Sequence, residues 1–302
     1  MHYRLNNAAT SLTSNINECR MSREMSIPIL SIFIGINPIL FSIGSFEIGW
    51  HGIFVVIAVI VGIGLSVWFA RGAGIKREVI YSISPWAIIG GIIGARLIHV
   101  VDYLGSTYIY NPVRIFEFWF GLSIFGAILG GTLAVFIYTR IRRISLGRLA
   151  DGVAPALILA QAVGRIGCTI NGDAYGAQTS WPWAFVYTHP NAAATTVLGV
   201  PGHPSPLYEI IWDLIVFAVL WRLRGRLKPD GSLFLLYLSL YSFGRFLIEF
   251  SRAVNRYQIS AGVLHEAHFI ALLVMAICIP LLIYRMRRAR AEPLAEPAAE
   301  AD

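Results

Sequence analysis

The sequence predicts an all-α protein that crosses a membrane seven times. Three observations lead to this prediction: the low share of charged residues, the number of long apolar segments, and the loops in which the basic residues lie. Of the 302 residues, 56% are hydrophobic and 14% are charged, and the mean hydropathy is +0.65. Because soluble domains carry about 25% charged residues, this composition excludes a soluble enzyme.

Seven apolar segments are each long enough to cross about 30 Å of hydrocarbon as a helix. We assign residues 48–285 to one transmembrane domain, with a polar external arm over residues 171–205 between its fourth and fifth spans. The seven expected spans are residues 48–69, 80–103, 120–140, 149–170, 206–222, 232–251 and 262–284.

The two ends of the chain lie outside this domain. An apolar stretch over residues 27–44 is interrupted by a glycine and by an Asn-Pro pair, so we expect an interfacial arm over residues 27–47 instead of a further span. Residues 1–26 form a polar extension. The apolar stretch after them lacks the form of a signal peptide, because this polar extension precedes it and no small-residue cleavage site follows. Residues 286–302 are expected to be a disordered cytoplasmic tail.

The basic residues orient the spans, because cytoplasmic loops are rich in Lys and Arg. Most of the 24 basic residues lie in the four loops that follow spans one, three, five and seven. This pattern places the N-terminus outside and the C-terminus in the cytoplasm. Topology thus accounts for the net charge of +7, and no nucleic-acid partner is expected. The loop cations are Arg71, Lys76, Arg77, Arg140, Arg142, Arg143, Arg148, Arg222, Arg224, Arg226, Lys228, Arg285, Arg287, Arg288 and Arg290.

Three arginines, Arg96, Arg165 and Arg245, remain inside the spans. Each lies toward the outer end of its span, and an arginine at a span centre costs about 2.5 to 3.5 kcal/mol on insertion scales. A guanidinium donates two parallel hydrogen bonds, which suits a phosphodiester. Three such groups at one depth indicate a phospholipid head group as ligand. The alternative is that these side chains snorkel or form structural pairs.

Few acids are available as counterions inside the spans. Tyr241, Arg245 and Glu249 follow one another at intervals of four residues, so phenol, guanidinium and carboxylate share one helix face. An internal salt bridge that stabilises the bundle is the alternative reading of this trio. Near the inner end of span four, we expect Asp151 to pair with the basic loop. The candidate counterions are Asp102, Asp151, Asp173, Glu209, Asp213 and Glu249.

The three cysteines, Cys19, Cys168 and Cys278, lie far apart and show no ligand spacing. Their positions predict neither a disulfide framework nor a zinc site. We therefore expect no metal and no cofactor.

The most specific motif covers residues 164–176, which end span four and open the external arm. Its glycines allow the backbone to approach a bound group closely, and the arm contains Trp181 and Trp183, which suit a membrane interface. The pairing of this glycine-rich turn with Arg165 makes it a candidate binding site.

Together these motifs resemble the prolipoprotein diacylglyceryl transferase family over residues 37–285. The resemblance implies a seven-helix enzyme of the bacterial plasma membrane. It would take the diacylglyceryl group from phosphatidylglycerol and attach it to the lipobox cysteine of a prolipoprotein, leaving a thioether and releasing glycerol phosphate. The implied partners are that lipid, the lipobox peptide and the bilayer. The matching motifs are residues 37–44, 50–52, 94–97, 121–126, 164–176, 203–209 and 241–252.

The resemblance also implies roles for single residues. Arg165 and Arg245 would stabilise the departing phosphate, and Tyr241 and Glu249 would position Arg245. The implied catalytic residues are Arg165, Arg245, Tyr241 and His51. The implied substrate-binding residues are Arg165, Arg245, Arg96, Asn171, Asp173, Gly176, Glu249 and His203, and Arg96 has a structural alternative.

The chain departs from the family's motifs at four positions. Phe125 aligns with the histidine commonly assigned as the family's base, and Phe cannot take a proton. His51, Cys168 and Asp173 stand where the family usually has Tyr, Asn and Glu. Our hypothesis is that His51 supplies the imidazole, with His99 and His203 as other candidate bases. The alternative is that His51 is an interfacial histidine without a role.

Two other functions fit the sequence less completely. A catalytically altered relative would bind anionic phospholipid without transferring it. A transporter would also carry charges inside its spans, but the sequence shows no convincing repeated half and the charges gather at one depth.

Overall fold

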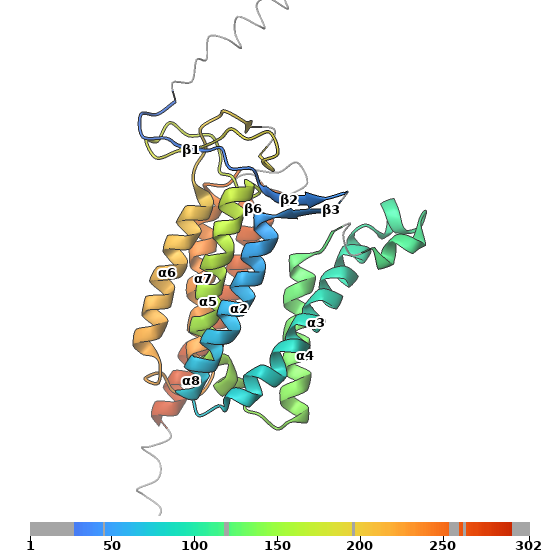
Figure 1. The fold of residues 1–302 in the computed structure, drawn as a ribbon. Coiled ribbons are helices and arrows are strands. Elements are labelled where there is room, and N and C mark those ends of the chain that lie inside the picture. The colour runs from blue at the N-terminus through green and yellow to red at the C-terminus, as the bar shows by residue number, and fades with distance from the viewer. Residues whose placement is uncertain are drawn as a thin grey trace, which may run out of the picture.

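The computed structural model describes residues 27–44, 46–117, 121–194, 197–253, 260–261 and 264–291, and this part of the chain is mostly helical. The predicted helical fold is confirmed, and six short strands in the described residues add three two-stranded sheets that were not predicted. The long helices, drawn in Figure 1, are α2 (Trp50–Arg71), α3 (Arg77–Asp102), α4 (Ile124–Ile141), α5 (Leu146–Asn171), α6 (Ser205–Leu223), α7 (Ser232–Glu249) and α8 (Glu266–Ala291).

Six helices in the described part of the chain are long and apolar enough to cross a membrane, which makes this a polytopic membrane protein. They are α2, α3, α4, α5, α7 and α8. The remaining long helix, α6, contains Glu209, Asp213 and Arg222, and these charges keep it out of that set. Both acids are buried, and Ile211 and Ile215 are half exposed on the outside of the same helix.

The tail is shorter than predicted, because α8 continues to Ala291. Its last turns are rich in Arg, Ala and Met, which are good helix formers, and cations are favourable at a helix C-terminus. The expected disorder over residues 286–302 is therefore wrong for residues 286–291. The predicted extension over residues 1–26 and the tail beyond residue 291 lie outside the described residues.

Helices α2, α5, α6, α7 and α8 pack side by side, and α5 contacts α2, α6 and α7. Small residues permit this packing, since α5 buries Gly152, Ala154, Ala156 and Gly167 among its neighbours. At Gly167, an added Cβ would lie 2.9 Å from the Cβ of Phe54 and 3.1 Å from the Cα of His51. The C-terminal end of α5 can approach α2 only because this residue is glycine.

Helices α3 and α4 pack mainly on each other, and α3 also contacts α2 (Figure 1). Six glycines line their contact, three on each helix, and the closest approaches are made by two glycines on each helix at an interval of four residues. A Cβ added at Gly94 would lie 2.8 Å from the Cα of Gly130, and one added at Gly90 would lie 2.8 Å from the carbonyl oxygen of Gly130. Opposed glycines of this kind let two helix backbones touch inside a membrane.

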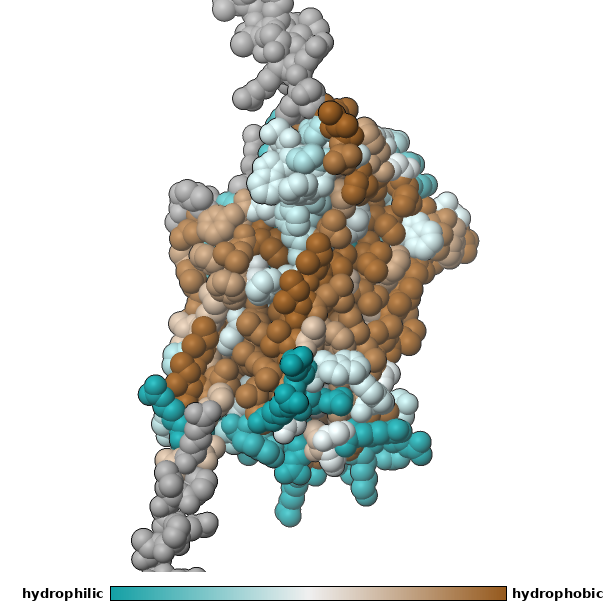
Figure 2. All heavy atoms as spheres, turned by 90° about the vertical axis from the view of Figure 1, so that its left-hand side faces the viewer, coloured by the Kyte–Doolittle hydropathy of each residue, from teal (hydrophilic) through white to brown (hydrophobic). Residues whose placement is uncertain are grey.

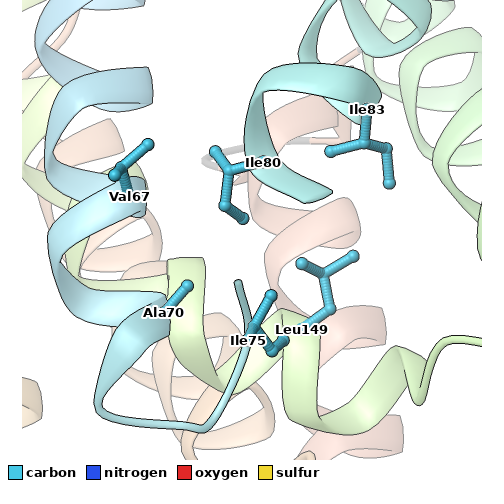
Figure 3. Close-up of a cluster of buried hydrophobic side chains, with 6 residues drawn as sticks. All are labelled: Val67, Ala70, Ile75, Ile80, Ile83 and Leu149. Carbon is cyan, nitrogen blue, oxygen red and sulfur yellow. The ribbon is translucent and has the colours of Figure 1, made fainter. Parts of the chain in front are cut away.

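A hydrophobic cluster joins α2, α3 and α5 near the C-terminal end of α2 and the N-terminal end of α5 (Figure 3). Nearby, Asp151 of α5 accepts hydrogen bonds from the backbone N–H groups of Gly231 at 2.6 Å and Phe234 at 2.9 Å. This carboxylate thus satisfies the start of α7, where a negative charge is favourable, instead of pairing with a basic side chain. The cluster comprises Val67, Ala70, Ile75, Ile80, Ile83 and Leu149.

One end of the bundle, called the outer end below, is covered by strands and by the arm between α5 and α6 (Figure 1). Strand β1 (Ile32–Ile34) pairs in parallel with β4 (Phe185–Tyr187) of that arm, and β2 (Ile39–Ile43) forms a hairpin with β3 (Phe46–Gly49). The Tyr187 hydroxyl donates to the carbonyl of Thr169, which fastens the arm to the end of α5. The short pair β5 (Ser260–Ala261) and β6 (Leu264–His265) precedes α8.

The surface is banded along the bundle axis. Figure 2 shows a broad hydrophobic belt with hydrophilic residues gathered at one end and paler residues at the other. The hydrophilic end carries the basic loops, among them the exposed Arg71, Arg140 and Arg226. An apolar belt between two polar ends is the surface that a bilayer requires.

Candidate active site

Glu209 of α6 lies at the centre of a buried charge cluster near the outer end of the bundle. Its carboxylate pairs with three arginines: Arg165 Nε from α5, Arg245 Nη1 at 2.7 Å from α7, and Arg252 Nη1 at 3.0 Å from the segment after α7. The Glu209 side chain is 6% exposed. One acid therefore joins three segments of the chain.

Glu249, the last residue of α7, is the second acid of this cluster. Its carboxylate lies 2.8 Å from Arg245 Nη2 and 3.8 Å from Arg252 Nε. His265 Nδ1 lies 3.8 Å away on the other side. The predicted face of Tyr241, Arg245 and Glu249 is thus present, and the salt bridge weighed as its alternative forms within it.

Three guanidinium groups and two carboxylates leave one net positive charge in the cluster. Burial and the neighbouring Arg245 lower the pKa of Arg252, but an arginine remains charged at any physiological pH. The arginine side chains keep roughly a fifth to a quarter of their surface exposed, 25% for Arg165 and 18% for Arg252. Partly desolvated guanidinium groups with an open side suit a monoanionic ligand.

The close packing of α6 on α7 brings Glu209 to Arg245. A Cβ added at Gly244 would overlap the ring of Trp212, so glycine lets that ring lie against α7. The Trp212 indole then donates to the carbonyl of Leu240 at 2.9 Å. This packing fixes the level along the helix axes at which Glu209 and Arg245 meet.

The segment that carries Arg252 is held by the glycine-rich motif. Gly176 forms a β-bridge with Arg252, and an added Cβ there would lie 2.7 Å from Ser205 Oγ. Ser205, at the start of α6, shares a hydroxyl hydrogen bond with Ser251 at 2.9 Å. Gly176 therefore allows its own segment, the segment of Arg252 and the start of α6 to approach one another closely, which a residue with a side chain would prevent.

A second group of side chains lies beside Arg165. The Cys168 sulfur is 3.8 Å from Arg165 Nη1 and 3.8 Å from His51 Nδ1. The same His51 nitrogen lies 4.0 Å from Asp173 Oδ2. The ligand atoms of His51, Cys168 and Asp173 all fall within 4.8 Å of one another. Sequence spacing gave no sign of such a group, because its members come from two helices and a loop.

His203 lies in an aromatic group of the external arm. Its Nδ1 is 3.3 Å from the Tyr208 hydroxyl, and its ring packs 5.4 Å from that of Trp181. The Trp183 indole donates to the same hydroxyl at 3.0 Å. Burial lowers the pKa of His203, so its imidazole is neutral at pH 7.

Arg96 belongs to a different set of contacts. Its guanidinium donates to the carbonyls of Ile115 at 2.9 Å, Gly121 at 3.0 Å and Arg114, and it lies 5.3 Å from the centre of the Tyr108 ring. These contacts hold the loop between α3 and α4, which contains the turns η1 (Leu104–Tyr108) and η2 (Pro112–Phe116).

The remaining predicted residues flank the two groups. Asn171 is the last residue of α5, and its carbonyl accepts from Ala193 N–H at 2.8 Å. Tyr241 lies one turn before Arg245 and interacts electrostatically with Arg165 and Glu209.

Two positions named in the search for a base remain, the candidate base His99 on α3 and Phe125 on α4. Phe125, at the start of α4, is 44% exposed. His99 of α3 packs on Tyr103 at 4.7 Å between ring centres.

Sequence reasoning missed two residues of the cluster. Glu209 was only one of six candidate counterions, and Arg252 was not among the three arginines singled out as candidate ligands. A signal for Arg252 did exist, since it lies three residues after Glu249 and seven after Arg245, which places it on the same face if the helical turn continues. For Glu209, the separation of 36 residues from Arg245 left no local signal.

Comparisons with known proteins agree on one family. A family model described as prolipoprotein diacylglyceryl transferase matches residues 38–284. A phosphatidylglycerol–prolipoprotein diacylglyceryl transferase of Dehalococcoides mccartyi is 38% identical over 256 residues, which cover 84% of this chain and 96% of that protein. A protein of the same name from Nostoc is 36% identical over 284 residues, covering 91% and 99%. One from Clostridioides difficile is 39% identical over 214 residues, covering 70% and 82%.

Proposed function

The chain belongs to the prolipoprotein diacylglyceryl transferase family, and from this membership we infer that it modifies lipoproteins at the outer face of a bacterial plasma membrane. It transfers the diacylglyceryl group of phosphatidylglycerol to the cysteine of a prolipoprotein. The observation that carries the assignment is the arginine cluster around Glu209, because its three guanidinium groups suit the phosphate of such a lipid. The transporter alternative has no support in this family.

The proposed topology has seven spans, with the N-terminus outside and the C-terminus in the cytoplasm. The span that brings the total to seven is α6, the fifth in chain order, whose two acids face the protein while Ile211 and Ile215 face outward. A helix of 19 residues with buried charges and an apolar outer side can cross a bilayer. The basic loops then all lie in the cytoplasm, as expected for such loops, and the arginine cluster lies near the outer leaflet.

Arg165 and Arg245 are the proposed phosphate ligands. In the structure they share Glu209, which holds both guanidinium groups at one height. A bound phosphodiester carries one negative charge, and this charge matches the single net positive charge of the cluster. Glu249 orients Arg245 from the opposite side through the 2.8 Å contact, and Tyr241 lies one turn below, within electrostatic reach of both arginines.

The transfer itself is a displacement at carbon. The lipobox thiol loses its proton, the sulfur bonds to a glycerol carbon of the lipid, and the bond from that carbon to the phosphate oxygen breaks. The electron pair goes to the phosphate, which leaves as glycerol phosphate. Its negative charge grows as the bond breaks, so guanidinium groups already in place stabilise the transition state more than the bound lipid.

The sulfur must be ionised for this attack, and a free thiol with a pKa of about 8.5 is mostly protonated at neutral pH. Phe125 stands where the family has its histidine and offers no proton acceptor. We assign this task to His51. Its Nδ1 contacts the Cys168 sulfur, which in turn contacts Arg165, and the same nitrogen lies 4.0 Å from the Asp173 carboxylate. Unchanged turnover in His51→Ala would contradict this assignment.

The other predicted residues take supporting places in the proposal. Asn171, Asp173 and Gly176 border the cluster at the end of α5, and Gly176 sets the position of Arg252. His203 belongs to the aromatic surface of the arm, where lipid head groups or the peptide would lie. Arg96 is a substrate contact only if lipid reaches the loop that its guanidinium holds.

Complementation tests the proposed function directly. The chain is expressed in a strain depleted of its own transferase, and a lipoprotein from that strain is examined by mass spectrometry. The expected result is growth together with a diacylglyceryl thioether on the lipobox cysteine. Good expression without that thioether would favour the alternative function, a relative that binds anionic phospholipid and does not transfer its diacylglyceryl group. Phe125 is the specific observation behind this alternative.

A further inference from the structure

Three residues at which the chain departs from its family's motifs meet at the outer ends of α2 and α5. They are His51, Cys168 and Asp173, and they offer one nitrogen, one sulfur and one carboxylate oxygen within 4.8 Å of one another. We propose that these side chains bind a zinc-class metal ion and leave a fourth position open for the lipobox thiol. The proposal deepens the transferase function above and rests on it for the role of the site.

The geometry is close to that of a tetrahedral site. Zinc bonds of about 2.0 to 2.3 Å place neighbouring ligand atoms about 3.3 to 3.6 Å apart. The His51 nitrogen lies 3.8 Å from the Cys168 sulfur and 4.0 Å from the Asp173 oxygen. The side chains of His51 and Asp173 are 41% and 38% exposed, so both can rotate to close the difference. Their exposure also leaves one side of the site open.

The surroundings hold the three ligands in place. Gly167 lets the start of α2 approach α5, since a Cβ there would lie 3.1 Å from the Cα of His51. Cys168 is buried and lies in the last turn of α5, so its sulfur has little freedom to move. Arg165 Nη1, at 3.8 Å from that sulfur, offsets the negative charge that Cys168 carries as a metal-bound thiolate.

The donor set selects the metal. A thiolate favours soft or borderline ions, an imidazole suits zinc, and a carboxylate is a common third ligand of catalytic zinc. Magnesium and calcium prefer oxygen ligands alone and are disfavoured here. Three protein ligands with an open fourth position are the usual pattern of a catalytic zinc site, whereas structural sites are closed.

Such a site would ionise the lipobox thiol, for which Phe125 offers no proton acceptor, and His51 would then act as a metal ligand in place of the base proposed above. The lipobox thiol takes the open position and loses its proton to solvent, because a thiol that coordinates zinc is deprotonated. The sulfur then bonds to the glycerol carbon, the bond from carbon to phosphate oxygen breaks, and glycerol phosphate departs toward Arg165 and Arg245. The neutral thioether sulfur then leaves the metal, and the displacement needs no oxidant or reductant.

The test is metal content of the purified full-length protein. After exposure to Zn²⁺ and removal of excess, elemental mass spectrometry should find one zinc per chain, and His51→Ala, Cys168→Ser and Asp173→Asn should each lower the zinc affinity about tenfold or more. The matched control is Cys278→Ser, which replaces a buried cysteine of α8 outside the group and should retain the metal. Co²⁺ in place of Zn²⁺ should give a thiolate-to-metal absorption band that only Cys168→Ser removes.

The outcomes separate this proposal from the proposed function. A protein that transfers diacylglycerol, binds no zinc and keeps its turnover after chelation overturns the metal site and leaves the function intact. Zinc bound with the predicted variant pattern, but with no thioether formed, supports the metal site and contradicts the transferase function. Thermal unfolding verifies that each variant is folded, so that loss of zinc binding can be distinguished from loss of the folded structure.

Discussion

At the scale of single residues, the site depends on a balance of charges. Glu209 and Glu249 hold three arginines that would otherwise repel one another in a partly dehydrated space. Removing one partner of a buried ion pair leaves an uncompensated charge, which is far more costly than losing a surface pair. The acids are therefore as important to the proposed anion site as the arginines proposed to contact the ligand.

Glu209→Gln tests this balance, because it keeps the side-chain shape and removes the charge. We expect the free energy of unfolding to fall by about 3 to 5 kcal/mol, and turnover to be lost as Arg165 and Arg245 separate. Thermal unfolding in detergent and a transfer assay measure the two effects. Glu78→Gln is the control, since Glu78 is exposed on α3 and pairs only with Arg77 among the described contacts. An unfolding midpoint of Glu209→Gln equal to that of the control would contradict the account.

The sequence predicted some of these residues and missed others for a physical reason. Arg165 and Arg245 could be identified because a charge inside a span requires a partner or a ligand. Contacts across the fold carry no such local sign: Glu209 is 43 residues from Arg252, and His51 is 117 residues from Cys168. Only the packing of the helices brings these groups together.

At the scale of elements, composition and periodicity predicted where the helices lie, and the ends differed by a few residues. The strands of the outer end were not predicted, because β1 pairs with β4, a segment of the distant external arm. The pairing of α3 with α4 was also not predicted, although Gly90 and Gly94 lie four residues apart in the sequence. This spacing indicates a helix contact only when the facing glycines of α4 are known.

Gly94→Leu tests the helix contact of α3 with α4. A Cβ at this position would lie 2.8 Å from the Cα of Gly130, so the two helices would have to separate along their whole contact. We expect less folded protein in the membrane and a lower unfolding temperature. Gly64→Ala of α2 is the control, because an added Cβ there meets nothing within 4 Å and alanine is the better helix former. Equal yield and stability of the two variants would show that the contact is unimportant.

At the scale of the whole molecule, one surface belt and one basic end define its place in the bilayer (Figure 2). The position of α6 decides whether the arginine cluster faces the outer leaflet, since the external arm precedes this helix and a basic loop follows it. If α6 crosses the bilayer, the two flanks lie on opposite sides. If it does not, they share one side.

Thiol labelling distinguishes these cases. Ser180→Cys lies in the exposed arm before α6, and Arg226→Cys lies in the exposed loop after it. With Cys19 replaced by serine and the buried Cys168 and Cys278 kept, an impermeant maleimide should label Ser180→Cys in right-side-out vesicles and Arg226→Cys in inverted ones. Labelling of both positions from one side would contradict the seven-span topology.

The central claim is that Arg165 and Arg245 stabilise the departing phosphate, and transfer by purified variants tests it most directly. Wild type, Arg245→Lys and Arg224→Lys are compared on phosphatidylglycerol and a lipobox peptide, with the thioether product and released glycerol phosphate measured by mass spectrometry. Lysine keeps the charge and loses the two-pronged donor, so we predict a fall in turnover of about 100-fold or more for Arg245→Lys. Arg224→Lys, beside Trp68 in the inner half of the bundle, should retain wild-type turnover. Equal thioether formation by all three proteins would contradict the claim.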